Sequence, residues 1–120
     1  MRPILIFLFF IIPYVSLAVG NLEITDGKTV AELMEIQNLI DSISSAITEC
    51  MESGSEHNEC MCRSRRIFSR FTVTVHAFFT KHPELEGQDL VNFRTHDGTI
   101  INQSLLGIRK QSQLKLECEQ

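Results

Sequence analysis

The chain has 120 residues, of which 43% are hydrophobic and 22% are charged, and its formal net charge is −4. That length accommodates one domain and excludes a large multidomain enzyme. The acidic balance argues against nucleic acid as the main partner, because binding to phosphates normally requires a basic surface.

The beginning of the chain has the features of a cleaved secretory signal peptide. Arg2 supplies the basic start, an apolar stretch runs from Ile4 to Val15, and small residues end the segment at Ala18. A cut after Gly20 is a second possibility. A membrane-spanning helix needs about 20 apolar residues, and this stretch is shorter. We therefore expect export, with a signal peptide at 1–18.

Two expectations follow for the rest of the chain. Residues 19–120 should form a single small domain, secreted or periplasmic, with no membrane span after cleavage. A domain of this size buries only a modest core, so covalent crosslinks would add substantially to its stability.

The next segment predicts an amphipathic helix that ends near Gly54. Thr29 and Glu32 fit a capping box at its start. Apolar residues then recur at spacings of three and four: Leu33, Ile36, Ile40, Ile43, Ile47 and Cys50. Such a seam predicts packing on the domain's own core. It is also compatible with a coiled-coil contact, so we expect a monomer or a weak homodimer.

The segment from Cys60 to His82 predicts a second helix. Its alternating part, residues 71–76, resembles a strand, but the length of the segment and the absence of internal glycine or proline favour a helix that ends before Pro83. Residues 21–62 contain nine acids and one base, whereas residues 63–81 contain five bases and no acid. We expect the two helices to form a hairpin with the acidic helix against the basic one.

A β-hairpin should follow, with strands at residues 90–95 and 99–102. A two-residue turn would pair Phe93 with Asn102. A three-residue loop with Gly98 in the left-handed region would pair Phe93 with Ile101, which matches two apolar residues and is preferred. Ser104 then caps a short helix, and an extended tail leads to the last cysteine.

The four cysteines predict two disulfides in an exported chain. A bond between Cys60 and Cys62 would close a very tight ring. Since Cys50 and Cys60 both lie on apolar helix faces, the preferred pairing is Cys50–Cys60 with Cys62–Cys118. The exchange of partners, Cys50–Cys62 with Cys60–Cys118, is nearly as plausible from the sequence.

A soft-metal site for copper or zinc is the alternative function for this region. Met51, His57, Cys60 and Cys62 lie close together, and thiolate and thioether ligands suit Cu(I). An isolated Cys-x-Cys is a weak motif, however, and cysteines in an oxidising compartment usually pair with each other. We therefore expect disulfides and no cofactor.

Nothing in the sequence predicts catalysis. Gly-x-Ser-x-Gly, a glycine-rich phosphate loop and His-Glu-x-x-His are all absent, and paired cysteines leave no thiolate for a Cys–His mechanism. One basic cluster, which we call the arginine cluster, consists of Arg63, Arg65, Arg66 and Arg70. It is a candidate contact for an anion or a partner, although pairing with the acidic helix is the simpler expectation.

Several short motifs are shared with other proteins. They are a Cys-x-Cys that opens a helix at Cys60, the run Lys81-His82-Pro83-Glu84-Leu85 that closes it, a following strand pair, and the late Cys118. In these features about half of the chain resembles small exported bacterial proteins of uncharacterised function, which often carry an aromatic residue where Leu85 stands. The resemblance implies a periplasmic or secreted setting and brings no assigned activity.

The sequence thus predicts an α+β fold: a disulfide-stapled helical hairpin, then a small β-hairpin, then a tethered C-terminal tail. The predicted function is that of a non-enzymatic exported binding module, with another protein or an envelope component as its partner.

Overall fold

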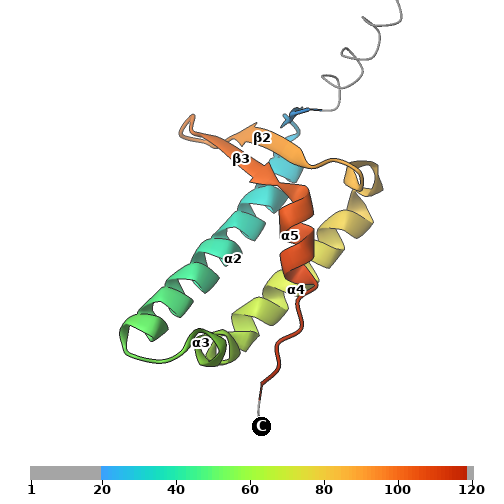
Figure 1. Ribbon diagram of the computed structural model, residues 1–120. Coiled ribbons are helices and arrows are strands. Elements are labelled where there is room, and N and C mark those ends of the chain that lie inside the picture. Colours follow the sequence, from blue (N-terminus) through green and yellow to red (C-terminus); the bar gives the residue numbers. More distant parts are fainter. Residues whose placement is uncertain (1–19, 119–120) are drawn as a thin grey trace, which may run out of the picture.

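The computed structural model describes residues 20–118 (Figure 1). The signal peptide predicted at 1–18 lies outside the described residues. The elements in chain order are β1 (Leu22–Ile24), α2 (Gly27–Glu52), α3 (His57–Arg63), α4 (Arg65–Lys81), η1 (Pro83–Leu85), β2 (Leu90–Arg94), β3 (Ile100–Ser104) and α5 (Leu105–Ser112). The fold is α+β, as the sequence predicts.

The helix α2 begins earlier than expected because a different residue caps it. Asp26 is the N-cap, and its carboxylate accepts a hydrogen bond from the Thr29 backbone N–H at 3.0 Å. Thr29 lies within the first turn, is buried, and donates its hydroxyl hydrogen to Asp26. The capping box predicted at Thr29 and Glu32 is therefore wrong, since an ionised Asp three residues upstream already satisfies the free N–H.

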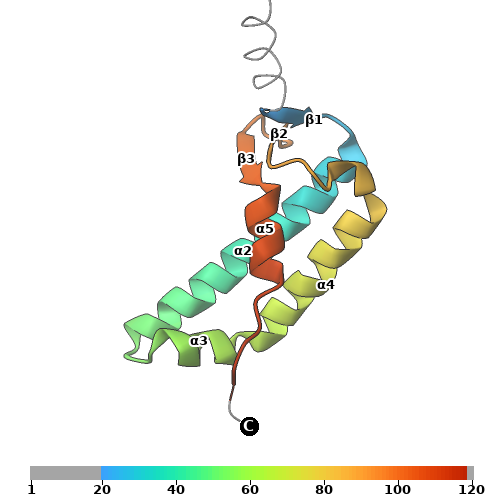
Figure 2. The same ribbon diagram turned by 45° about the vertical axis from the view of Figure 1, so that its right-hand side comes forward.

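The second predicted helix is divided into two. α3 and α4 are separated at Ser64, which is buried and closes α3 through its backbone N–H. The break lets α3 run across the end of the α2–α4 hairpin (Figure 2). The prediction of a helix rather than a strand at 71–76 is confirmed, because those residues lie within α4.

The sheet has three strands in the order β1-β2-β3, at one end of the hairpin. β2 and β3 are antiparallel, and Phe93 pairs with Ile101. Gly98 has a φ of +89°, so the predicted three-residue loop is confirmed. β1, which the sequence did not predict, pairs in parallel with β2 and places Ile24 opposite Phe93.

The core lies where the hairpin, the sheet and α5 meet. Its buried residues come from α2, α4, η1, β2 and α5: Leu33, Ile36, Leu39, Phe68, Phe71, Val75, Phe78, Phe79, Leu85, Val91, Phe93, Leu105 and Ile108. α5 packs along the hairpin beside the sheet, with Ser104 as its N-cap, as predicted. Arg109 of α5 lies over the Phe79 ring, 4.9 Å from its centroid, and pairs with Glu86.

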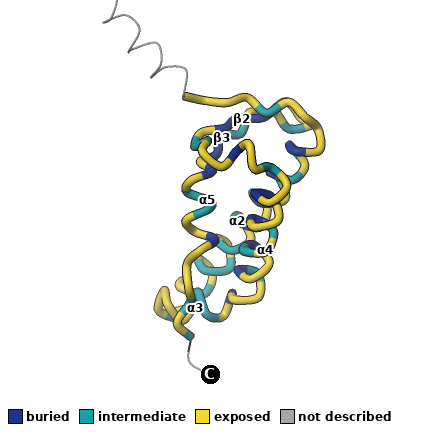
Figure 3. Tube along the Cα trace, turned by 90° about the vertical axis from the view of Figure 1, so that its right-hand side faces the viewer, coloured by how far each residue is buried: buried dark blue, intermediate teal, exposed yellow. Residues whose placement is uncertain are grey.

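The two ends of the hairpin differ in burial. We call the end beside the sheet the sheet end, and the end that contains α3 the disulfide end. Every buried residue of α2 lies at or before Leu39, whereas Ile40, Ile43 and Ile47 are only half-buried. Around α3 exposed and half-buried positions dominate (Figure 3).

Candidate functional site

The disulfide end is closed by two bonds, Cys50–Cys60 and Cys62–Cys118. In both bonds the Cα atoms are 5.6 Å apart, which is typical of disulfides. The preferred pairing is confirmed and the exchanged pairing is wrong. Cys50 lies in the last turns of α2 and Cys60 on the inner face of α3, so the helix faces select the pair, as the apolar seam indicated.

The metal-binding alternative conflicts with this bonding. It requires thiolates at Cys60 and Cys62, and both sulfur atoms are held in disulfides. Its two other members, Met51 and His57, are exposed. Within residues 20–118, no three histidine, cysteine or acidic side chains are grouped as a metal site would require.

The arginine cluster lies at the junction of α3 and α4. Arg63 pairs with Glu59 of its own helix at 2.5 Å, and its other terminal nitrogen is 3.9 Å from the Cys50 sulfur. Among residues 20–118, Arg65, Arg66 and Arg70 form no ion pair with α2 or any other element. The expected pairing of this cluster with the acidic helix is therefore wrong.

Three of these arginines surround a surface depression of about 390 Å³. It is lined by Glu59, Cys62, Arg63, Arg65 and Arg66. Its only acid, Glu59, is already paired with Arg63. The depression is therefore a cationic environment with Cys62 among its lining residues.

An apolar groove of about 370 Å³ lies on the neighbouring face of the disulfide end. It is lined by Ile40, Ile43, Ser44, Ile47, His57, Met61, Phe68, Phe71, Gln111 and Leu114. We call this the apolar groove. Its size and composition, mostly hydrophobic with a few polar groups, are typical of binding sites.

The groove exists because α5 is shorter than the hairpin that it covers. Leu33 and Ile36, at the sheet end of the α2 seam, are completely buried. The same seam continues toward Ile47, but α5 ends at Ser112 and the chain continues as an irregular tail. Leu114 of that tail is 55% exposed at the groove edge. Apolar side chains at the disulfide end thus remain accessible.

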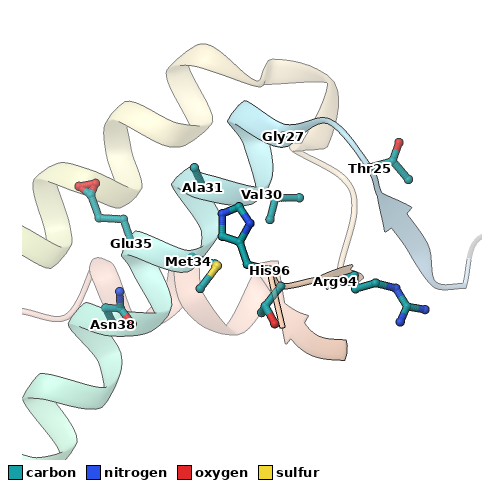
Figure 4. Close-up of a pocket in the computed structure, with 10 residues that line it drawn as sticks. Thr25, Gly27, Val30, Ala31, Met34, Glu35, Asn38, Arg94 and His96 are labelled. Atoms are coloured by element: carbon teal, nitrogen blue, oxygen red, sulfur yellow. The ribbon is translucent and has the colours of Figure 1, made fainter. Parts of the chain in front are cut away.

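A further pocket, of about 430 Å³, lies between the start of α2 and the tip of the β-hairpin (Figure 4). His96 extends over Val30 and Met34 of α2, whereas the Arg94 side chain is directed away. Arg94 instead donates a hydrogen bond to the Gly98 carbonyl at 3.2 Å. Glu35 points away from His96 along α2. The pocket therefore does not bring an acid and a base together.

A network of charged groups links α2 to the end of α4. One carboxylate oxygen of Glu32 is 2.7 Å from Lys81 Nζ, and the other is 2.7 Å from His82 Nε2. Partial burial by itself would raise the pKa of Glu32, but the hydrogen bonds from Lys81 and His82 outweigh it, so that the net shift is downward. His82 Nδ1 also faces Glu84 at 3.3 Å. These contacts fix one corner of the fold.

Neither the apolar groove nor the Glu32 network was predicted from the sequence. The groove depends on where α5 stops relative to α2, which no local pattern encodes. Of the other histidines, His57, His76 and His96 are exposed and lie on three different elements. Two features of the disulfide end could be recognised in the sequence. The number of cysteines predicted the disulfides, and the concentration of positive charge marked the arginine cluster.

Comparisons with protein-family models, with curated proteins and with solved structures found no match to this chain. Within the described part of the chain, no helix combines the length and the apolar character that crossing a membrane requires.

Proposed function

We propose that this protein is an exported, disulfide-braced binding module that acts through surface contact rather than catalysis. The apolar groove is its contact surface, and the ligand is an apolar segment of another protein or of an envelope component. The observation that carries the proposal is the uncovered part of the α2 seam, because half-buried isoleucines beside an exposed leucine leave apolar area that a partner would remove from water.

Two further observations support export. All four cysteines are paired, which fits an oxidising compartment. The signal peptide predicted at 1–18 and the resemblance to exported bacterial proteins favour the same location. Rigid crosslinks at the groove also reduce the conformational entropy that the protein would lose on binding.

The groove is tested with the oxidised mature protein and the neutral apolar dye Nile red. We expect one saturable site, because a preformed apolar groove excludes water around a ligand of similar size. Leu114→Asp should weaken the binding at least about tenfold, since it places a charge at the groove edge. Leu106→Asp is the matched control: Leu106 is 44% exposed on α5 and does not line the groove.

Two results would contradict the groove proposal: the absence of saturable binding, or equal losses in Leu114→Asp and Leu106→Asp. Circular dichroism of both variants separates a binding defect from unfolding. Export is tested separately by expressing the full chain in a bacterial host. We expect a mature chain that begins at Val19 in the exported fraction, and full-length protein with free thiols in the cytosol would overturn that part of the proposal.

A further inference from the structure

The two disulfides differ in how open they are to attack by a thiol. Cys60 is completely buried, whereas Cys62 and Cys118 are both partly exposed. Cys118 lies near the end of an irregular tail, whereas Cys60 is inside α3. Because exchange requires a thiolate to reach a sulfur atom, the Cys62–Cys118 bond is the more accessible of the two.

The surroundings of the sulfur atom that would leave during exchange also favour the Cys62–Cys118 bond. Cys62 lines the depression that also contains Arg65 and Arg66, and neither arginine forms an ion pair within residues 20–118. Nearby guanidinium groups stabilise a thiolate, which is the form in which a sulfur leaves during exchange. An attack on Cys118 therefore releases Cys62 into a cationic site.

The Cys50–Cys60 bond lacks this combination. An attack on the half-buried Cys50 would release Cys60 as a buried thiolate, which is costly because a buried charge loses its hydration. Arg63, 3.9 Å from the Cys50 sulfur, would favour Cys50 as the leaving group, but that route requires an attack on the inaccessible Cys60. Either direction is impeded.

We propose that Cys62–Cys118 is a thiol-exchange site for small anionic thiols, and that the arginine cluster attracts the thiol and stabilises Cys62 as the leaving thiolate. The attacking thiolate forms a bond to the Cys118 sulfur, the Cys62–Cys118 bond breaks, and its electron pair remains on Cys62. A second thiolate attacks the small thiol's sulfur and releases Cys118, which takes a proton from water. Two small thiols are oxidised to one disulfide, and the protein disulfide is reduced by two electrons.

The exchange has a structural consequence that rests on the proposed function. The tail supplies Leu114 to one wall of the apolar groove, and Cys62–Cys118 is the covalent bond that holds the tail there. Opening this bond frees the tail from α3 and widens the groove, while Cys50–Cys60 still braces the hairpin.

The test uses the oxidised mature protein at low ionic strength and three thiols: anionic glutathione, neutral 2-mercaptoethanol and cationic cysteamine. Free cysteines are alkylated at time points and assigned by peptide mapping, and rates are divided by the concentration of each thiolate. We expect Cys62–Cys118 to open at least about tenfold faster than Cys50–Cys60, with glutathione faster than cysteamine. The trapped mixed disulfide should be on Cys118.

Variants separate the arginine effect from simple exposure. The double substitution Arg65→Gln and Arg66→Gln should lower the rate ratio of glutathione to cysteamine at least about threefold, and Arg94→Gln, at the opposite end of the molecule, should leave it unchanged. Simultaneous opening of both bonds, a mixed disulfide on Cys62, or a ratio that the double variant does not alter would overturn the proposal. None of these measurements involves Nile red, so failure here is distinct from failure of the groove.

Discussion

The sheet end and the disulfide end of the same helical hairpin are stabilised by different means. At the sheet end, Leu33 and Ile36 of α2 are completely buried in the core that also contains residues of β2 and α5. At the disulfide end the seam continues through Ile43 and Ile47, which remain half-buried, and two covalent bonds hold α3 and the tail. Crosslinks thus substitute for apolar burial beyond the point where α5 ends.

This difference explains how a small domain can keep an apolar surface uncovered. A surface of this kind contributes little to folding, because its side chains remain in contact with water. Disulfides lower the entropy of the unfolded chain instead, so they stabilise the fold without filling the groove. The apolar groove and the covalent bonds therefore belong together at the disulfide end.

The largest predicted effect is the loss of both crosslinks. By the chain-entropy model, the bond that spans 10 residues contributes about 3 kcal/mol and the bond that spans 56 residues about 4 kcal/mol. Their sum is comparable to the whole stability of a small domain. A variant with alanine at all four cysteines should lack a cooperative thermal transition by circular dichroism, whereas Cys62→Ala with Cys118→Ala should retain one. A four-alanine variant that melts within a few degrees of the oxidised protein would contradict this account.

The next largest effect is the difference in stability between alanine substitutions at two positions of the α2 seam. Leu33→Ala should lower the free energy of unfolding by about 2–5 kcal/mol, because Leu33 is 0% exposed and its removal leaves a cavity. Ile47→Ala should cost less than about 1.5 kcal/mol, since Ile47 is half-buried at the open groove. Urea denaturation of both variants measures the difference. Equal costs would show that the two ends are packed alike.

A smaller effect concerns the turn of the β-hairpin at the sheet end. Gly98 has a φ of +89°, which is unfavourable for residues with a side chain. Gly98→Ala should therefore cost about 1–2 kcal/mol. Gly87→Ala is the control, because a Cβ at Gly87 meets nothing within 4 Å and its φ is not in the left-handed region. If both substitutions had the same effect on urea denaturation, strain at Gly98 would not be the cause.

The features that the sequence predicted correctly have strong local or pairwise signals. The heptad-like seam indicated α2, the preference for matching Phe93 with Ile101 gave the hairpin register, and the apolar positions of Cys50 and Cys60 selected the disulfide pairing. In each case the choice depends on which face of an element a residue occupies, and periodicity reports that directly.

The features that were missed depend on contacts between distant segments. β1 has only three residues, and its partner lies almost seventy residues along the chain, so no local pattern identifies it. The break at Ser64 separates α4 from α3, whose Cys60 and Cys62 are bonded to α2 and to the tail, and these long-range bonds are not visible in a local pattern. The arginine cluster was expected to pair with α2, but its unpaired members lie on exposed positions of α4.

The smallest predicted effect concerns the ion pairs of Glu32 with Lys81 and His82 at the sheet end. The pKa of Glu32 in the folded protein lies below its ordinary value of 4.5. At a pH between this lowered pKa and 4.5, Glu32 is therefore more often protonated in the unfolded chain than in the folded protein. Its contribution to stability is therefore fully present above pH 4.5 and is lost as the pH falls through the lowered pKa. Glu32→Gln should lower the free energy of unfolding by about 1 kcal/mol near neutral pH, because Lys81 and His82 lose a charged acceptor.

The pH dependence separates this network from a general effect of charge on α2. The difference between Glu32→Gln and the unsubstituted protein should shrink in urea denaturation as the pH drops below 4.5. Glu35→Gln provides the control, since Glu35 is exposed one turn along α2 and forms no ion pair within residues 20–118. A difference that stays constant with pH, or that Glu35→Gln reproduces, would mean that the Glu32 contacts do not stabilise this corner. In that case apolar packing alone would distinguish the sheet end from the disulfide end.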